Sequence, residues 1–365
     1  MQATNYARGS MSKKRIIIHI GFPRCASTLL QREIFPRLTG DIRVISPASA
    51  DRRLVDFLNE HFILSGRNIN LSPVGELERR RICDIVAEYP ESTILVSSEG
   101  LVGDSFDNML PLPHLAGALR LLFDEPELLV VIRRQSDLVK SYYRYALEEG
   151  YYESFSAFLG FRNGRFAGFR LQRYAGVNVD PVTLNFYNFV VYLEAVFGAN
   201  KVHILPYELI NTDFGRFCHK LADTLGAKLR MPHDPPPVRN RGVHGADCFL
   251  LRALNRLWAT KIVGVQLLPN QPFIRYFDSK CRDGGLALRC LRAISARFSP
   301  MGALRVISPL IAPFLNSLLS AFSITELGPD HAITQAIDSA VFESNVALNE
   351  KLGGHLTGLG YCDPH

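Results

Sequence analysis

The sequence predicts an α/β fold in which helices cover both faces of a central parallel sheet of about five strands. Short apolar runs alternate with stretches of helical spacing along the chain, which is typical of strands joined by crossover helices. One run, residues 128–132 (LLVVI), is apolar throughout, as a central strand buried on both faces should be.

The composition is that of an ordinary globular protein, with 365 residues, 47% hydrophobic and 21% charged. This length suits one large domain or a domain with a substantial insertion. The net charge of +6 favours anionic ligands or surfaces in general terms. The arginine runs that begin at positions 52 and 79 are expected on solvated helix faces, so no nucleic-acid partner is expected.

The seven cysteines are scattered and odd in number, without a C-x-x-C pair or a histidine at metal spacing. This pattern indicates reduced thiols in a cytoplasm and no structural zinc. Residues 1–14 have no apolar core, so we expect a disordered lead-in rather than a signal peptide.

The first element is a strand that leads through a tight loop into a helix, and residues 16–31 read IIIHIGFPRCASTLLQ. Gly21 and Pro23 break the strand, and apolar residues recur at helical spacing from position 29 to position 38. The N–H groups at a helix start have no intrahelical partner, and the helix dipole adds positive charge there. With Arg24 and the hydroxyls of Ser27 and Thr28, the loop is a candidate phosphate site.

Two well-known phosphate loops are excluded by the residues of this stretch. A nucleotide-triphosphatase loop needs a second glycine followed by lysine, and both are missing after Gly21. A cysteine phosphatase loop would need arginine six residues after Cys25, where Gln31 stands. The alternative is a plain strand–turn–helix with an incidental arginine.

The later elements alternate in the order that a parallel sheet requires. Strands are predicted at residues 42–45, 93–96, 128–132 and 201–205. Helices are predicted at residues 51–62, 75–88, 136–148, 182–197 and 209–225, and a loop rich in proline and arginine at 232–245.

Charged residues follow two of these strands. Glu99 comes just after the third strand, and Arg133 directly follows the fourth. Ligands of open α/β sheets sit beyond the carboxyl ends of the strands, so Arg24, Glu99 and Arg133 are expected to be neighbours. Arg133 and Ser141, eight residues apart, are placed to face one anion; the alternative is that Arg133 pairs with Asp137 while Ser141 only packs.

Several stretches resemble sulfotransferases that use 3′-phosphoadenosine 5′-phosphosulfate (PAPS). GFPRCASTLLQ resembles the family's 5′-phosphosulfate loop, which usually reads P-K-T-G-T-T-x-L. VIRRQSDLVKSYYRY resembles its 3′-phosphate motif, with Arg133, Ser141, Tyr142 and Tyr143 in place. LPYELI, VRNRG and the final FESNVALNEKLGGHLTGLGY resemble the fifth-strand ending, a late nucleotide loop and the tail of bacterial members.

The resemblance implies a P-loop-like three-layer sandwich that binds PAPS as cosubstrate and needs no metal. It assigns PAPS binding to Pro23, Arg24, Cys25, Ala26, Ser27, Thr28, Arg133, Ser141, Arg239, Arg241 and Gly242. Arg24 stands where the family has lysine and Ala26 where it has glycine. Arginine keeps the charge but cannot give up its proton, and alanine restricts the loop backbone.

The activity implied is transfer of a sulfuryl group to a hydroxyl or amine of a glycan, glycolipid or small molecule. Glu99 and Arg24 are the expected catalytic residues, with Glu99 as the general base and His114 or His19 as the alternatives. A second hypothesis is a non-catalytic nucleotide- or anion-binding protein on the same fold. A kinase fits less well, because the loop lysine and a magnesium carboxylate after the fourth strand are both absent.

The domain boundaries expected are a core at residues 15–248, a helical insertion or cap at 249–325, and a C-terminal helix and tail at 326–365 that pack on the core. The insertion is rich in Leu, Ile, Ala and Arg and too interrupted for a transmembrane helix. Three interpretations of the insertion remain: a cap over the acceptor site, a basic amphipathic patch at 286–322 that contacts a membrane, and extra helices packed on the core. The expected location is the cytoplasm, with or without contact to the inner face of a membrane.

Overall fold

The computed structural model describes residues 14–60, 75–99, 101, 112–166, 180–231, 246–259, 268–269, 300, 303–304 and 331–363. By their contacts the residues cluster into two compact units. The first unit comprises Met1–Arg134, Asn185–Arg239 and Phe342–Asp363, and the second comprises Gln135–Leu184, Asn240–Val341 and Pro364–His365.

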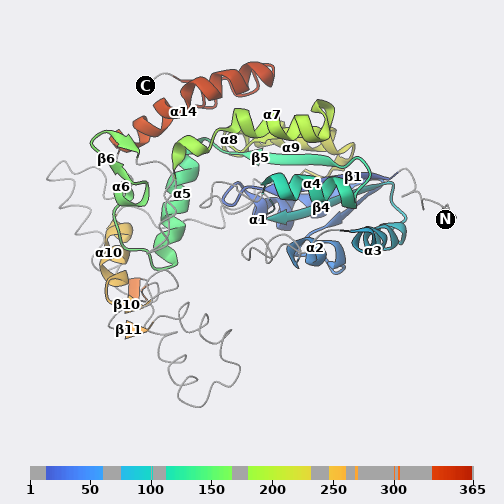
Figure 1. Cartoon of the computed structure of the whole chain (residues 1–365), viewed down its shortest axis with the longest axis horizontal. Helices are drawn as coiled ribbons and strands as arrows, with labels where there is room; N and C mark the ends of the chain where they lie inside the picture. The colour runs from blue at the N-terminus through green and yellow to red at the C-terminus, as the bar shows by residue number, and fades with distance from the viewer. Residues whose placement is uncertain are drawn as a thin grey trace, which may run out of the picture. The chain divides into compact units, whose positions relative to one another are not determined.

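The first unit contains a five-stranded sheet in which every neighbouring pair of strands is parallel, which confirms the predicted fold class. The strand order is β3-β4-β1-β5-β8, so β1 lies at the centre (Figure 1). The bounds are β1 Arg15–Gly21, β3 Ile42–Ile45, β4 Thr93–Glu99, β5 Glu127–Ile132 and β8 Val202–Pro206.

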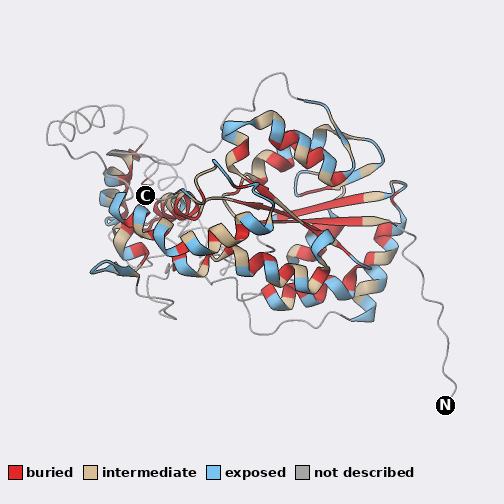
Figure 2. Ribbon diagram, turned by 90° about the horizontal axis from the view of Figure 1, so that it is seen from above, coloured by how far each residue is buried: buried red, intermediate tan, exposed pale blue. Residues whose placement is uncertain are grey.

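The apolar runs of the sequence fill the middle of this sheet. Leu128 and its four successors in β5 have no exposed surface, and Ile17 and Ile18 of β1 are equally buried. Figure 2 shows these buried strands with helices on both sides of the sheet. Side chains packed on both faces explain why the strands read as continuous apolar runs rather than as alternating ones.

The helical segments of the first unit lie between the strands in sequence. They are α1 Ser27–Leu29, η1 Leu30–Ile34, η2 Phe35–Arg37, α2 Arg53–Leu58, α3 Glu76–Ala87, α4 Leu112–Leu122, α7 Phe186–Phe197, η7 Ala199–Lys201, α8 Glu208–Thr212 and α9 Phe214–Leu225. Two short strands, β2 Leu38–Thr39 and β9 Lys228–Leu229, pair antiparallel. This pairing connects the chain after η2 with the chain after α9.

Three predicted helices differ from the observed ones. The helix predicted at 182–197 begins only at Phe186, after the 3₁₀-turn Pro181–Thr183, and the Asn185 side chain caps it by accepting the Asn188 N–H at 2.9 Å. The helix predicted at 209–225 is divided at Asp213, whose carboxylate accepts the Arg216 N–H at 2.9 Å and so caps a new helix. The helix after the first loop begins at Ser27 as predicted, but it continues as a π-turn and a 3₁₀-turn, and Leu38 lies in β2. Pro36 lacks the N–H that an α-helix would need, which favours this change of hydrogen bonding.

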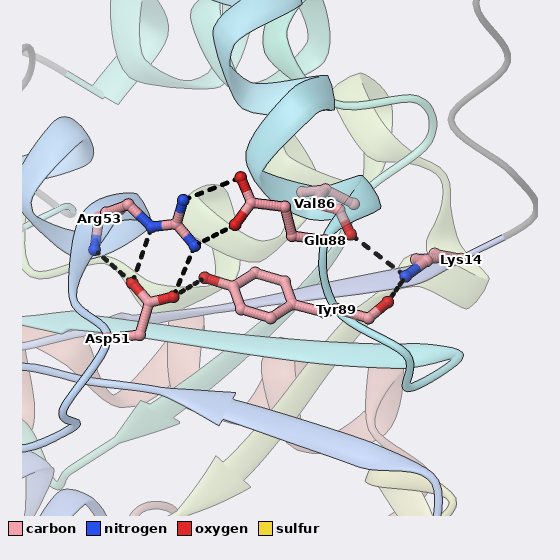
Figure 3. Close-up of polar contacts among 6 residues, drawn as sticks. All are labelled: Lys14, Asp51, Arg53, Val86, Glu88 and Tyr89. Carbon is pink, nitrogen blue, oxygen red and sulfur yellow. Dashed lines mark hydrogen bonds and ion pairs between the residues drawn. The ribbon is translucent and has the colours of Figure 1, made fainter.

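A polar cluster ties α2 to the end of α3 (Figure 3). The Asp51 carboxylate accepts the Tyr89 O–H at 2.8 Å and an Arg53 N–H at 2.9 Å. Arg53 also donates to Glu88 at 2.7 Å. Lys14, just before β1, donates to the Tyr89 carbonyl. The cluster thus joins three segments that are distant in sequence.

The second unit contains α5 Gln135–Glu148, α6 Phe155–Phe158, β6 Phe161–Arg162, β7 Arg165–Phe166, η6 Pro181–Thr183, α10 Ala246–Asn255, β10 Trp258–Ala259 and β11 Leu268–Pro269. Its core includes Tyr143 of α5, which packs on Tyr151, Phe155 and Phe158. The Asn255 side chain donates to the Tyr151 carbonyl at 2.9 Å and so holds α10 in place.

The last helix, α14 His331–Lys351, begins in the second unit and ends in the first. Nearly all of the stretch 286–322 lies outside the described residues, and so does the predicted loop at 232–245. None of the helices in the described ranges is long and apolar enough to cross a membrane.

Candidate functional site

The loop after β1 contains two residues in the left-handed backbone region. Arg24 has a φ of 69° and Ala26 a φ of 65°, and the Cys25 N–H donates to the Phe22 carbonyl at 3.2 Å. Alternation of left- and right-handed residues turns successive N–H groups toward one concave side, a geometry that binds anions. Ala26 holds this conformation against a steric cost of about 1 kcal/mol, which glycine would not bear.

Gly21 makes room for the first hydroxyl of the helix. A Cβ at this position would lie 2.6 Å from Ser27 Oγ, so any larger residue would force the Ser27 hydroxyl to move. Ser27 is buried, and its Oγ has no hydrogen-bond partner among the described residues. A buried hydroxyl without a partner is costly, and a ligand oxygen at the loop would satisfy it.

Arg133, at the end of β5, holds the loop from one side. Its Nη1 donates to the Arg24 carbonyl at 3.1 Å, and its guanidinium lies 4.4 Å from the centre of the Tyr207 ring. Its Nε is buried and has no partner in the described part of the chain. A fixed guanidinium with a spare donor is suited to an anion.

Glu99 holds the same loop from the other side. It is the last residue of β4, and its carboxylate accepts the backbone N–H of Arg24. Burial raises the pKa of Glu99, while the charge and the N–H of Arg24 act against that rise. The structure thus brings Arg24, Glu99 and Arg133 together at the carboxyl edge of the sheet, as the strand order predicts.

Glu99 also faces a cavity of about 540 Å³, which leaves its side chain accessible to solvent. Four segments of the chain provide the walls, namely the residues Thr28, Gln31, Arg32, Pro47, Ala48, Asn59, Ser98 and Glu99. Asn59 accepts the Ser98 O–H at 2.5 Å. Asn59 and Arg32 could not be predicted as site residues, because neither belongs to a motif and both reach the cavity only through the packing of their helices.

His19 is a packed strand residue and not a free base. It has no exposed surface, and its Nδ1 lies 2.8 Å from Ser97 Oγ, which also accepts the Gln31 side-chain N–H at 3.0 Å. Burial lowers the pKa of His19 to about 4, so the ring is neutral at pH 7. His114, the other alternative base, lies in α4 and is not among the described residues that line the cavity.

Cys25 is buried within the loop, and burial raises the pKa of its thiol. A protonated thiol is a poor nucleophile, in keeping with the exclusion of a cysteine phosphatase loop. Pro23 and Thr28 lie in the same loop and at the start of α1, half-buried.

The remaining predicted residues are placed as follows. Ser141 is a buried residue of α5, in the second unit, and its joint role with Arg133 stays a prediction. Arg239, Arg241 and Gly242 lie outside the described residues. Within the described ranges, no group of three His, Cys, Asp or Glu side chains is arranged to hold a metal ion.

One glutamate of this region was missed by the sequence analysis. Glu208, the first residue of α8, is half-buried, and its Oε1 accepts the Arg134 N–H at 2.8 Å. The signal for it was the stretch LPYELI, in which Glu208 follows the fifth strand just as Arg133 follows the fourth.

Comparisons with known proteins give structural similarity only. No family model matches the chain, and no curated protein matches it. A sulfotransferase from Alicyclobacillus acidocaldarius is similar over 76% of this chain and 99% of that chain, with 15% identity and a TM-score of 0.41. The mouse sulfotransferase SULT7A1 complexed with PAP is similar over 76% and 88%, with 14% identity and a TM-score of 0.34. At such values the similarity carries no argument about the fold or the chemistry of this chain.

Proposed function

We propose that this protein is a sulfotransferase that moves a sulfuryl group from PAPS to a hydroxyl or amine of an acceptor. One observation carries the proposal. A single anion-binding loop is held through the carbonyl of Arg24 by Arg133 and through the N–H of Arg24 by Glu99, beside a cavity that Glu99 lines. The paired phosphate motifs of the sequence support the same assignment.

The loop supplies what the 5′ side of PAPS requires. Its N–H groups, the side chain of Arg24 and the hydroxyls of Ser27 and Thr28 would stabilise negative charge on the phosphosulfate. Ser27 Oγ and Arg133 Nε have no hydrogen-bond partner within the described ranges, which fits such an anionic ligand. Arg133 and Ser141 would bind the 3′-phosphate.

In the reaction, the acceptor oxygen forms a bond to sulfur while the bond from sulfur to the phosphate oxygen breaks. The leaving phosphate keeps the electron pair, and Glu99 takes the proton of the acceptor. A raised pKa brings Glu99 nearer to the operating pH, which favours general-base catalysis. Its hydrogen bond from the Arg24 N–H also couples the base to the loop.

The acceptor class we propose is a glycan or glycolipid. The cavity volume of about 540 Å³ is in the usual range for a site that binds an organic ligand. Gln31, Arg32 and Asn59 line it with hydrogen-bonding groups, which suit an acceptor with several hydroxyls.

A non-catalytic nucleotide-binding protein is the second candidate. Glu99 already accepts the Arg24 N–H, so the carboxylate has a structural contact as well as access to the cavity. Turnover of labelled PAPS with a panel of glycans separates the two candidates.

The nucleotide assignment is tested by thermal-shift measurements with adenosine 3′,5′-bisphosphate, AMP and ATP. A ligand that binds only the native state raises the melting temperature by mass action. We expect the bisphosphate to stabilise the protein far more than AMP, and Arg133→Ala to remove the difference. Equal shifts with AMP and the bisphosphate in the wild-type protein would show that the 3′ assignment is wrong.

A further inference from the structure

The C-terminal tail after α14 folds back and buries Tyr361, which is 3% exposed. The Asn345 side chain donates to the Tyr361 carbonyl at 3.1 Å. Nearer the turn, Asn349 accepts the Leu356 N–H at 2.8 Å and donates to Thr357 Oγ1 at 3.1 Å. The tail is therefore anchored at two places along its own helix.

The hydroxyl of Tyr361 contacts the half-buried glutamate after the fifth strand. It donates to Glu208 Oε2 at 2.7 Å, while Glu208 Oε1 accepts the Arg134 N–H at 2.8 Å. Burial raises the pKa of both groups, and the two donors act against that rise in Glu208. A half-buried carboxylate whose two oxygens each accept a hydrogen bond is held in one orientation.

Glu208 and its neighbour in sequence contact the two arginines after β5. Tyr207 donates its N–H to the Ile132 carbonyl at 2.7 Å, and its ring lies under the Arg133 guanidinium. Glu208 binds the N–H of the next residue, Arg134. Both contacts fix the backbone that carries Arg133, whose Nη1 in turn binds the Arg24 carbonyl.

The tail also lies against the side chain of Arg134. Gly360 has a φ of 80°, which favours glycine, and a Cβ there would lie 2.8 Å from Arg134 Nη1, the end of a flexible side chain.

We propose that Tyr361 is a positioning residue, which acts through Glu208 to hold Arg133 against the anion-binding loop. The ligand part of this inference rests on the proposed function, because the anion that Arg133 meets is taken to be the 3′-phosphate of the nucleotide. The mechanical part rests only on the contacts from Tyr361 to Arg24.

The test compares Tyr361→Phe with Asn349→Ala, a matched variant that loosens the same tail without touching Glu208. Tyr361→Phe removes one hydroxyl and keeps the ring. We expect the dissociation constant for adenosine 3′,5′-bisphosphate to rise roughly 5- to 20-fold, a size typical of coupled contacts. We also expect faster hydrogen exchange of the loop amides at residues 22–27 in the ligand-free protein. Asn349→Ala should change neither value by more than about twofold.

The route through Glu208 is tested by adding Glu208→Gln. If Tyr361 acts through this carboxylate, Tyr361→Phe should have a much smaller effect in the Glu208→Gln background than in the wild type. Equal effects in both backgrounds would overturn the route.

Two failures are distinguishable. A wild-type protein that binds no bisphosphate contradicts the proposed function, while the loop exchange still tests the role of Tyr361. Tyr361→Phe could instead lower the melting temperature while its loop hydrogen exchange and its bisphosphate affinity match those of Asn349→Ala. Tyr361 would then have only a structural role, and the inference would be wrong. Should Tyr361→Phe not fold, Gly360→Ala displaces the same tail and is measured in its place.

Discussion

At the scale of single residues, the role of Glu99 is the sharpest question. Glu99→Gln keeps an oxygen that accepts the Arg24 N–H but cannot take a proton. Because a positioned base is worth roughly 10²- to 10⁴-fold, we expect turnover of PAPS to fall by that factor. Bisphosphate affinity should stay nearly unchanged. The base form of a carboxyl is lost as the pH falls through its pKa, so the acid limb of the wild-type rate profile should disappear in the variant.

Two results would contradict this role. Near-normal turnover of Glu99→Gln would end the assignment and make His114 the next residue to test. A parallel loss of rate, affinity and melting temperature would show that Glu99 mainly positions the loop.

Ala26 is a residue at which a stabilising change is expected. Its φ of 65° strains any side chain with a Cβ, so Ala26→Gly should raise the free energy of unfolding by up to about 1 kcal/mol. Denaturant unfolding measures the change. Ala87→Gly, at the exposed end of α3, is the control, since glycine in a helix should destabilise by about 0.5–1 kcal/mol. Equal losses in both variants would contradict the strain at Ala26.

At the scale of elements, the strands were predictable and the helix interruptions were not. The central strands β1, β4 and β5 are buried on both faces, so their apolar runs stand out in the sequence. The division at Asp213 depends on one side chain that caps a helix inside an otherwise helical pattern. The π-turn at Leu30–Ile34 leads into the 3₁₀-turn that contains Pro36, and the apolar spacing of this stretch is the same as for an α-helix.

The cluster of Figure 3 gives an element-scale prediction about pH. The hydrogen bond from Arg53 holds the pKa of Asp51 below its ordinary value. Because the pKa of Asp51 is lower in the folded protein than in the unfolded one, the ionised carboxylate stabilises the fold. This stabilisation is complete above the unfolded pKa, near 3.8, and is lost as the pH falls through the pKa of the folded protein. Asp51→Asn should therefore lower the melting temperature at pH 7. The difference in melting temperature between wild type and variant should shrink below about pH 4.

Asp56→Asn is the control for Asp51. Asp56 forms an exposed pair with Arg52 at 2.8 Å, and such surface pairs contribute little. The ionised pair of Asp51 and Arg53 would be contradicted if wild type and Asp51→Asn differed in melting temperature by the same amount from pH 7 down to pH 2.

At the scale of the whole molecule, the edge of the sheet explains which site residues could be predicted. Glu99 ends β4 and Arg133 follows β5, and these two strands flank β1, so the strand order places both residues beside the loop after β1. Asn59 and Tyr361 reach the same edge from α2 and from the tail. Their positions follow from tertiary packing, which no local pattern encodes.

The whole site predicts a reaction that is independent of metal ions. Negative charge near the loop is met by Arg24, Arg133 and the hydroxyls of α1, and β5 is followed by two arginines where a magnesium carboxylate would lie. We expect transfer from labelled PAPS to survive excess chelator and to change less than about twofold on addition of Mg²⁺. The same chelator should stop a metal-dependent kinase assayed in parallel. A strict requirement for Mg²⁺ would point instead to phosphoryl transfer, in which the metal bridges the phosphates and the arginines play a secondary part.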